Sequence, residues 1–243
     1  MIDAALSAAF EATWPPAETV QAGGFAVGRG MGGGGRVASA RRVGDDWSPA
    51  DIDAAVEIQR GWDQTPQFRV ADEETGLAAA LEQRGFQRHN PTVTLVAPVN
   101  ALTDQAVPPV TAFAVWPPMA IQRDIWTAGG IGPARQAVMM RAPDPRSALL
   151  GRIKDRAAGA GFVAVHGDVA MVHGLTILPE WRRLGLAGWM MRKAAFWATD
   201  QGATRLGLAV SRGNTAAVAL YSGLGMTEAG GYAYYAAPEP GAA

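Results

Sequence analysis

A short run of arginines and glycines, Arg182 to Gly188, is the part of this sequence best suited to chemistry. It follows an apolar, strand-like run, Val169 to Leu178, and precedes an apolar, helix-like run, Trp189 to Ala198. Glycine and alanine keep side chains away from the backbone at the helix start, where exposed amides and the helix dipole favour an anion. The two arginines add positive charge. The sequence therefore predicts a strand, a turn and a helix that bind a phosphate or a pyrophosphate.

The spacing of these residues excludes two common nucleotide motifs. The dinucleotide fingerprint needs Gly-x-Gly-x-x-Gly in a βαβ unit and an acidic residue about 20 positions later. The segment Gly185 to Gly188 does not fit it. The phosphate loop ends in Gly-Lys-Ser/Thr, whereas the only lysines here are Lys154 and Lys193. The pattern that the segment does contain is Arg-x-x-Gly-x-Ala, preceded in the sequence by Leu-Thr-Ile-x-Pro-Glu.

This motif and its surroundings resemble the acyl-CoA-binding motif of the GCN5-related N-acetyltransferases, the GNAT family. The family motif, Gln/Arg-x-x-Gly-x-Gly/Ala, follows a strand that ends Leu-Ala-Val-x-Pro, and here Leu175 to Glu180 precede Arg182. Downstream, Asn214 to Met226 is similar to the family's Asn-x-x-Ala-x-x-Leu-Tyr-x-x-x-Gly-Phe, with methionine in place of phenylalanine. The resemblance covers roughly residues 110 to 238.

The resemblance implies that acetyl-CoA is the co-substrate and that backbone groups bind much of it. In the family, the strand before the turn splays from its neighbour and pairs with the pantetheine arm, as an added strand would. Gly174 would permit the bulge that opens this gap. The implied binding residues are Leu175, Thr176, Ile177, Arg182, Arg183, Leu184, Gly185, Leu186, Ala187, Gly188, Asn214, Ala217 and Tyr221.

For catalysis, the resemblance implies that Tyr221 lies beside the thioester sulfur and protonates the departing thiolate. A phenol with an ordinary pKa of about 10 carries its proton at neutral pH. A core tyrosine that only orients its neighbours is the alternative. Asn214 is implied to contact the arm of the carrier, and asparagine is also among the best helix N-caps.

The general base is less specified by the sequence. His173 alternates with Leu175 and Ile177 on one strand, and some family members use a histidine here to relay the amine proton through water. Histidine titrates near neutrality, although a half-buried histidine that bonds a neighbour is an equal alternative. Glu180 is the rival carboxylate. His166 is expected at a hairpin turn, and a His166/His173 metal pair lacks a third ligand, so no metal is expected.

The acceptor pocket is expected from the segment Trp116 to Arg141 and from the last strand. We expect most of its large side chains to be core residues, with some arginines available to bind a carboxylate. The candidates are Trp116, Trp126, Met139, Met140, Arg123, Arg135, Arg141, Tyr232, Tyr234 and Tyr235.

Composition sets wider bounds. The 243 residues allow one large or two small domains, and a net charge of −1 offers no broad attraction to nucleic acid or an anionic membrane. The absence of cysteine excludes disulfides, thiolate metal sites and a cysteine nucleophile. With no basic leader and no long apolar run, we expect a cytoplasmic protein, a monomer or a homodimer.

The sequence also indicates a tandem repeat. When it is aligned with itself at an offset of 140 residues, Thr75 matches Thr215 and Gly85 matches Gly225. We expect strands at 36–43, 67–70 and 92–97, and helices at 49–60, after an N-cap at Ser48, and at 76–84. At this offset Gly185 is matched by Asp45, Ala187 by Trp47 and Tyr221 by Leu81, and Asp46 adds a second acid. The first copy should therefore not bind the carrier.

Together these observations predict an α/β fold: a GNAT-like, mixed and largely antiparallel twisted sheet flanked by helices, present twice. The expected domains are 1–100, a degenerate copy, and 111–243, the acetyltransferase, joined by 101–110. The expected activity is transfer of acetyl from acetyl-CoA to a primary amine of a small molecule or amino-acid derivative, in class EC 2.3.1, by direct attack. The alternatives are acetylation of protein N-termini and a catalytically silent acyl-CoA-binding sensor or interaction module.

Overall fold

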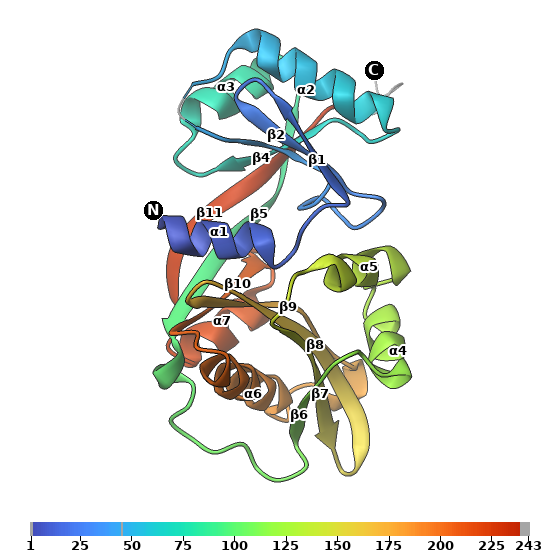
Figure 1. Cartoon of the computed structure of the whole chain (residues 1–243), viewed down its shortest axis with the longest axis vertical. Helices are drawn as coiled ribbons and strands as arrows, with labels where there is room; N and C mark the ends of the chain where they lie inside the picture. The colour runs from blue at the N-terminus through green and yellow to red at the C-terminus, as the bar shows by residue number, and fades with distance from the viewer. Residues whose placement is uncertain (1, 45, 239–243) are drawn as a thin grey trace. The chain divides into compact units, whose positions relative to one another are not determined.

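The computed structural model of the chain describes residues 2–44 and 46–238, so Met1, Asp45 and the last five residues lie outside it (Figure 1). The chain forms two compact units. Unit 1 consists of Met1–Pro15, Thr94–Val210 and Asn214–Ala229, and unit 2 of Pro16–Val93, Ser211–Gly213 and Gly230–Ala243. The units follow a different division from the expected repeats, because the first fifteen residues belong to unit 1 and the end of the last strand belongs to unit 2. The repeat boundaries at 100 and 111 remain a prediction.

Unit 1 is built on the strand order β6-β7-β8-β9-β10-β5. The pairs from β6 to β9 are antiparallel, and β9 pairs with β10 in parallel. The helices α1 and α4 pack on the face that carries Phe162, and α6 packs on the face that carries Gly159. Its elements are α1 (Ala4–Ala12), β6 (Ala112–Val115), α4 (Ala120–Ala128), α5 (Pro133–Arg141), β7 (Arg146–Ile153), β8 (Arg156–His166), β9 (Val169–Ile177), η2 (Pro179–Trp181), α6 (Leu186–Asp200), β10 (Arg205–Ser211) and α7 (Thr215–Gly223).

Unit 2 is built on the strand order β1-β2-β3-β4-β11. Only β3 and β4 pair in parallel. Three strands, β5, β10 and β11, contribute residues to both units. The elements are β1 (Glu18–Ala22), β2 (Phe25–Arg29), β3 (Ala40–Arg42), α2 (Pro49–Gly61), β4 (Gln67–Ala71), α3 (Thr75–Gln83), β5 (Gln87–Pro98) and β11 (Thr227–Ala236), and the short turn η1 (Val99–Ala101) that follows β5 belongs to unit 1.

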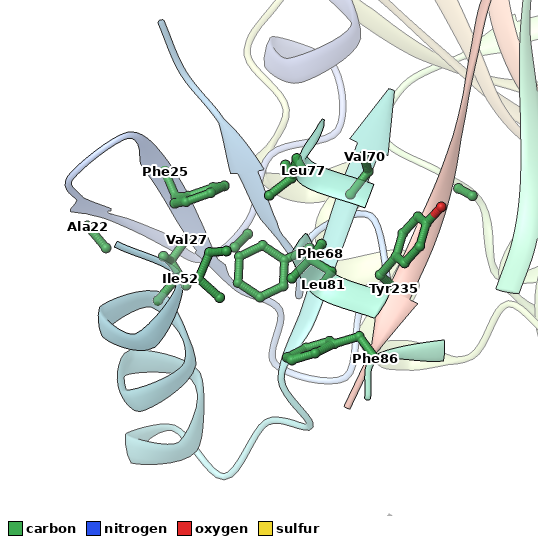
Figure 2. Packing of buried hydrophobic residues seen from close by; sticks show 13 residues of the cluster. Ala22, Phe25, Val27, Ile52, Phe68, Val70, Leu77, Leu81, Phe86 and Tyr235 are labelled. Carbon is green, nitrogen blue, oxygen red and sulfur yellow. The ribbon is translucent and has the colours of Figure 1, made fainter. Parts of the chain in front are cut away.

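The core of unit 2 lies between its sheet and the helices α2 and α3 (Figure 2). Phe68 on β4 is fully buried, and the rings of Phe25 and Phe86 meet it edge-on at 5.3 and 5.6 Å. Edge-to-face packing of this kind adds roughly 1 kcal/mol per pair to the burial term. Tyr235, one of the expected acceptor-pocket tyrosines, belongs to this core.

The element order of the two halves confirms the internal repeat. Helices α3 and α7 have the same length and begin at Thr75 and Thr215, and strands β5 and β11 begin at Gln87 and Thr227. The predicted cap of α2 is also present, because Ser48 and Asp51 form a capping box with Pro49 in the first turn. The expected strand at 36–43 is shorter than predicted, since only Ala40–Arg42 is a strand.

Candidate functional site

A cavity of about 670 Å³ opens in unit 1 where β9, the start of α6 and the helix α7 meet. Twelve of the thirteen predicted binding residues line it, and the exception is Leu184, which is 57% exposed. The sequence therefore located this cavity. Its lining residues are Gly129, Leu175, Thr176, Ile177, Trp181, Arg182, Arg183, Gly185, Leu186, Ala187, Gly188, Asn214, Ala216, Ala217, Leu220 and Tyr221.

The start of α6 presents bare backbone amides to this cavity. Gly185 is the N-cap, with a left-handed φ of 79°, and has no side chain to cap the helix. The first backbone bond of the helix runs from the Trp189 N–H to the Gly185 carbonyl, so the three amides between them have no acceptor within the helix. A Cβ atom at Gly185 or Gly188 would meet nothing within 4 Å. The helix start is thus open to an anionic ligand.

The two arginines of the motif flank this helix start. Arg182 donates from Nε to the Ile177 carbonyl at 3.0 Å, which ties the turn to the end of β9. Arg183 has a left-handed φ of 62°, and both arginine side chains are exposed. Their guanidinium groups are therefore available to a ligand at low desolvation cost.

Strands β9 and β10 separate beside the cavity. Their parallel pairing runs from Val169 with Arg205 to Val172 with Leu208 and ends there among the described residues. Strand β9 continues to Ile177 and β10 to Ser211. Backbone groups near the end of β9 therefore lie outside the ladder to β10, which is the arrangement that an extended ligand arm needs to add itself to the strand.

A β-bulge accompanies this separation, as expected from Gly174. Phe162 on β8 faces His173, and Ala160 faces Thr176, so one residue of β8 stands opposite two of β9. Gly174 has a left-handed φ of 57°. Because directly opposed residues share a face of the sheet, the extra residue places His173 and Thr176 on the same face.

The bulge changes which side chains of β9 share a face of the sheet, and this corrects one expectation. We expected His173 to share a face with Leu175 and Ile177, and this is wrong because the bulge inserts a residue between them. A period-2 pattern holds only while the ladder is regular, and a single added residue reverses the faces beyond it. His173 points to the side of α1 and α4, whereas Ile177 lies against Gly159 and the α6 side.

Tyr221 lies near the end of α7, in the cavity wall, and is 7% exposed. Burial raises the pKa of its hydroxyl to about 12, because the phenolate would lose its hydration there. Among the described residues, no group forms a hydrogen bond with this hydroxyl. The hydroxyl is thus protonated at neutral pH, and the side chain that carries it lines the cavity.

His173 is buried beside the first helix of the chain. Its Nε2 lies 2.8 Å from the Thr13 hydroxyl, and that hydroxyl lies 2.7 Å from the Ala9 carbonyl. Since a threonine hydroxyl has one proton, which it donates to Ala9, the contact with His173 is one in which Nε2 donates. The rings of Trp14 and Phe162 enclose the imidazole at 5.0 and 6.1 Å. His173 does not line the cavity described above.

The remaining chemical candidates have simpler surroundings. Asn214 caps α7 by accepting from the Ala217 N–H at 3.2 Å, and it also lines the cavity. Glu180 is exposed in the turn η2, and His166 is exposed at the end of β8, next to the expected hairpin turn.

No group of three or more metal-ligating side chains occurs in the part of the chain that the structure describes. No described helix is both long enough and apolar enough to cross a membrane.

The large side chains expected near the acceptor divide into core and surface. Trp126 and Met139 are buried core residues, whereas Met140 is 41% exposed. Trp116 packs on Phe162 at 5.9 Å, and the Arg146 guanidinium lies over its ring at 4.6 Å. This agrees with the expectation that most of these residues are structural. Of the other candidates, Arg123 and Arg135 are exposed. Arg141 donates to the Pro15 carbonyl at 3.4 Å. Tyr232 and Tyr234 are buried in unit 2.

The matching helix start in unit 2 already holds an anion. The Asp51 carboxylate accepts from the N–H groups of Ser48 at 2.9 Å and Gly24 at 3.3 Å, and these bonds lower its pKa. A Cβ atom on Gly24 would lie 2.3 Å from the Asp46 carbonyl and 2.9 Å from the Trp47 side chain, so Gly24 packs closely against the segment before α2. The expected role of Asp45 falls outside the described residues. The start of α2 is thus capped by side chains of its own, the Ser48 hydroxyl and the Asp51 carboxylate.

Four lining residues were not predicted. Leu220 and Ala216 belong to the Asn214–Met226 segment and Trp181 precedes Arg182, so the motifs themselves could have indicated them. Gly129 follows α4, and a Cβ atom there would lie 2.3 Å from Thr176 Cγ2. No local pattern marks Gly129, because only the tertiary structure brings it to β9.

Comparisons with known proteins agree with this geometry. Residues 119–226 match the model of the acetyltransferase (GNAT) family. A GCN5-related N-acetyltransferase from Kribbella flavida has a similar structure, with a TM-score of 0.73, 21% identity, and coverage of 96% of this chain and 94% of that one. A functionally unknown conserved protein from Staphylococcus epidermidis follows, with a TM-score of 0.67, 13% identity and coverage of 90% and 92%.

A tandem GNAT protein from the clavulanic acid biosynthesis pathway is also similar, with a TM-score of 0.60 and 16% identity. It covers 93% of this chain and 86% of its own, so the likeness includes both halves. No curated protein matches the chain. These similarities confirm the predicted fold, including a GNAT-like N-terminal half.

Proposed function

We propose that this chain transfers the acetyl group of acetyl-CoA to a primary amine of a small molecule or an amino-acid derivative, since residues 119–226 match the acetyltransferase (GNAT) family model. The observation that carries the proposal is the cavity of unit 1, in which the bare start of α6, the open end of β9 and the Tyr221 hydroxyl meet. Each of these parts suits a different portion of an acyl-CoA.

The pyrophosphate would bind at the start of α6. The three amides after Gly185 and the exposed guanidinium groups of Arg182 and Arg183 supply donors and positive charge. The pantetheine arm carries two amides, and it would pair with the end of β9, where the ladder to β10 has stopped. Asn214 and Ala217, at the start of α7, line the same cavity and would contact the arm.

Chemistry then needs no acyl-enzyme. The neutral amine attacks the thioester carbon, and the carbonyl oxygen gains negative charge that a β9 amide, such as that of Leu175, stabilises. The amine loses a proton, the C–S bond breaks, and Tyr221 donates its proton to the thiolate. Solvent reprotonates the phenolate. The products are the acetamide and the free thiol, so atoms and charge balance.

We propose His173 as the group that relays the amine proton through water. Since its Nε2 donates to Thr13, Nδ1 is the atom that would accept a proton in the neutral ring. Thr13 would then fix the tautomer that the relay requires. The alternative is that His173 only ties α1 to β9 and that water accepts the proton without a dedicated base.

The direct experiment measures thiol release from acetyl-CoA with a panel of amines. Small amines and amino-acid derivatives should support turnover at rates well above background hydrolysis. Turnover only with peptides that have free N-termini would favour protein N-terminal acetylation instead. Tight acetyl-CoA binding, shown by calorimetry, without turnover for any amine would favour the silent sensor.

A further inference from the structure

Trp126, a buried residue in the last turn of α4, contacts the backbone of the bulge through its side chain. Its indole Nε1 donates to the Gly174 carbonyl at 2.9 Å. The Thr176 hydroxyl is a second donor to the same oxygen, at 3.3 Å. The bond reaches across 48 residues of sequence. It therefore holds one particular peptide unit, 174–175, of the strand that the carrier would meet.

The orientation of that peptide unit decides where the next amide points. In a trans peptide, the carbonyl of residue 174 and the N–H of residue 175 point in opposite directions. With the Gly174 carbonyl directed at Trp126, the Leu175 N–H is directed away from α4. Leu175 is also one of the residues that line the cavity of unit 1. A rotation of this peptide would redirect the amide proposed to stabilise the oxyanion.

The surroundings of Gly174 show that α4 and α5 hold the bulge from one side. A Cβ atom on Gly174 would lie 3.1 Å from Met139 Cε, 3.2 Å from Ile131 Cδ1 and 3.6 Å from Trp126 Nε1. Gly174 is therefore required both by its left-handed φ and by this close approach. The contacts leave the carbonyl little freedom to turn.

The donor itself is held in place. Trp126 is fully buried, so its ring has no room to change rotamer. The Gln136 side chain joins the two helices, because Nε2 donates to the carbonyls of Ile131 at 2.8 Å and Arg123 at 3.1 Å. A rigid donor on a packed helix pair is what a positioning residue needs.

We propose that Trp126 is a positioning residue for acetyl transfer: its indole N–H orients the 174–175 peptide so that the Leu175 N–H meets the thioester carbonyl. This inference rests on the proposed function. Trp126 does not touch the reacting atoms, and it acts through the bulge. Loss of its N–H should impair the reaction while the carrier still binds, since the start of α6 and the arm contacts remain.

The test replaces the indole N–H without removing the ring. Trp126→Phe removes the donor and some volume, and substitution of Trp126 by benzothienylalanine, in which sulfur replaces N–H, keeps the volume. For both variants we expect kcat to fall roughly ten- to a hundredfold. This loss is smaller than the loss caused by deletion of an oxyanion donor itself. We expect the KM for acetyl-CoA to change less than about threefold. Trp197→Phe, on α6, is the matched control.

A spectroscopic measurement separates positioning from structure. With acetyl-CoA labelled with ¹³C at the carbonyl, hydrogen bonding on the wild-type protein should lower the C=O stretching frequency. The benzothienylalanine variant should show a smaller shift at saturating acetyl-CoA, and Trp197→Phe should show the full shift. Full shift and full kcat in the variant would overturn the inference. So would failure of the isosteric variant to fold, because the bond would then be structural. A wild-type protein that does not bind acetyl-CoA would instead refute the proposed function and remove the basis of the inference.

Discussion

Replacement of Gly185 by aspartate tests the anion site with one carboxylate. Gly185 caps α6 with a left-handed φ, and the space above it is open, so the new side chain has room. Asparagine and aspartate tolerate this backbone region better than other residues do. The carboxylate can accept from the free amides of the first turn, as the Ser48 hydroxyl accepts from the Asp51 N–H at the start of α2. The variant should therefore fold.

The magnitude follows from the bonds that the pyrophosphate would lose. Hydrogen bonds to a charged group contribute about 1.5–3 kcal/mol each. Loss of two of the three free amides would cost about 3–6 kcal/mol, and each 1.4 kcal/mol is tenfold in affinity. We expect acetyl-CoA to bind roughly 10²- to 10⁴-fold more weakly. The thermal midpoint should change little, because favourable charge at a helix N-terminus offsets the strain of a left-handed residue.

The matched control is Gly185→Asn, which has the same size without the charge. Calorimetry with acetyl-CoA should rank the affinities as wild type, then asparagine, then aspartate. The difference between the two variants should shrink at high salt, because it is electrostatic. Equal affinities for all three folded proteins would refute the assignment of the pyrophosphate to the start of α6.

Three further predictions concern the site. Tyr221→Phe should lower kcat roughly a hundredfold with little change in the KM for acetyl-CoA, and an unchanged kcat would make the residue structural. Because burial raises the pKa of Tyr221 in the wild-type protein to about 12, no loss of rate from tyrosine ionisation is expected below about pH 10. If His173 relays the amine proton, His173→Gln should lose the low-pH limb of the wild-type kcat/KM profile, measured with the same acceptor; a limb that persists would exclude the relay. Titration should give one acetyl-CoA per chain, since the Asp51 carboxylate already occupies the start of α2; two equivalent sites would contradict this.

Features that depend on a few neighbouring residues could be predicted from the sequence. The cap at Ser48, the turn before α6 and the cap at Asn214 follow from local backbone preferences, which a side chain satisfies within three or four positions. The repeat was visible because helices α3 and α7 preserve their length and spacing. The cavity of unit 1 lies where the sequence predicted the binding residues for the same reason, since most of its wall is contributed by short segments around Arg182 and Asn214.

The sequence also placed a bulge at Gly174, because a glycine that precedes an apolar strand end favours such a conformation. The alternation of side chains along the strand did not predict which face of the sheet His173 occupies beside this bulge. Whether the extra residue lies before or after His173 decides which face the imidazole occupies, and that depends on the register with Phe162 on β8. A shift of one residue reverses the answer.

Contacts between distant segments were decided only by the tertiary structure. Thr13 and His173 are 160 residues apart, and Trp126 and Gly174 are 48 apart, so no local pattern joins them. The same is true of Gly129 in the cavity wall and of the first fifteen residues, which belong to unit 1. Residue types and spacing determined which chemistry we propose for the chain. Packing of α1 and α4 on β9 determined which atoms are held in position to perform it, because orientation at a bulge is set by the groups that surround it.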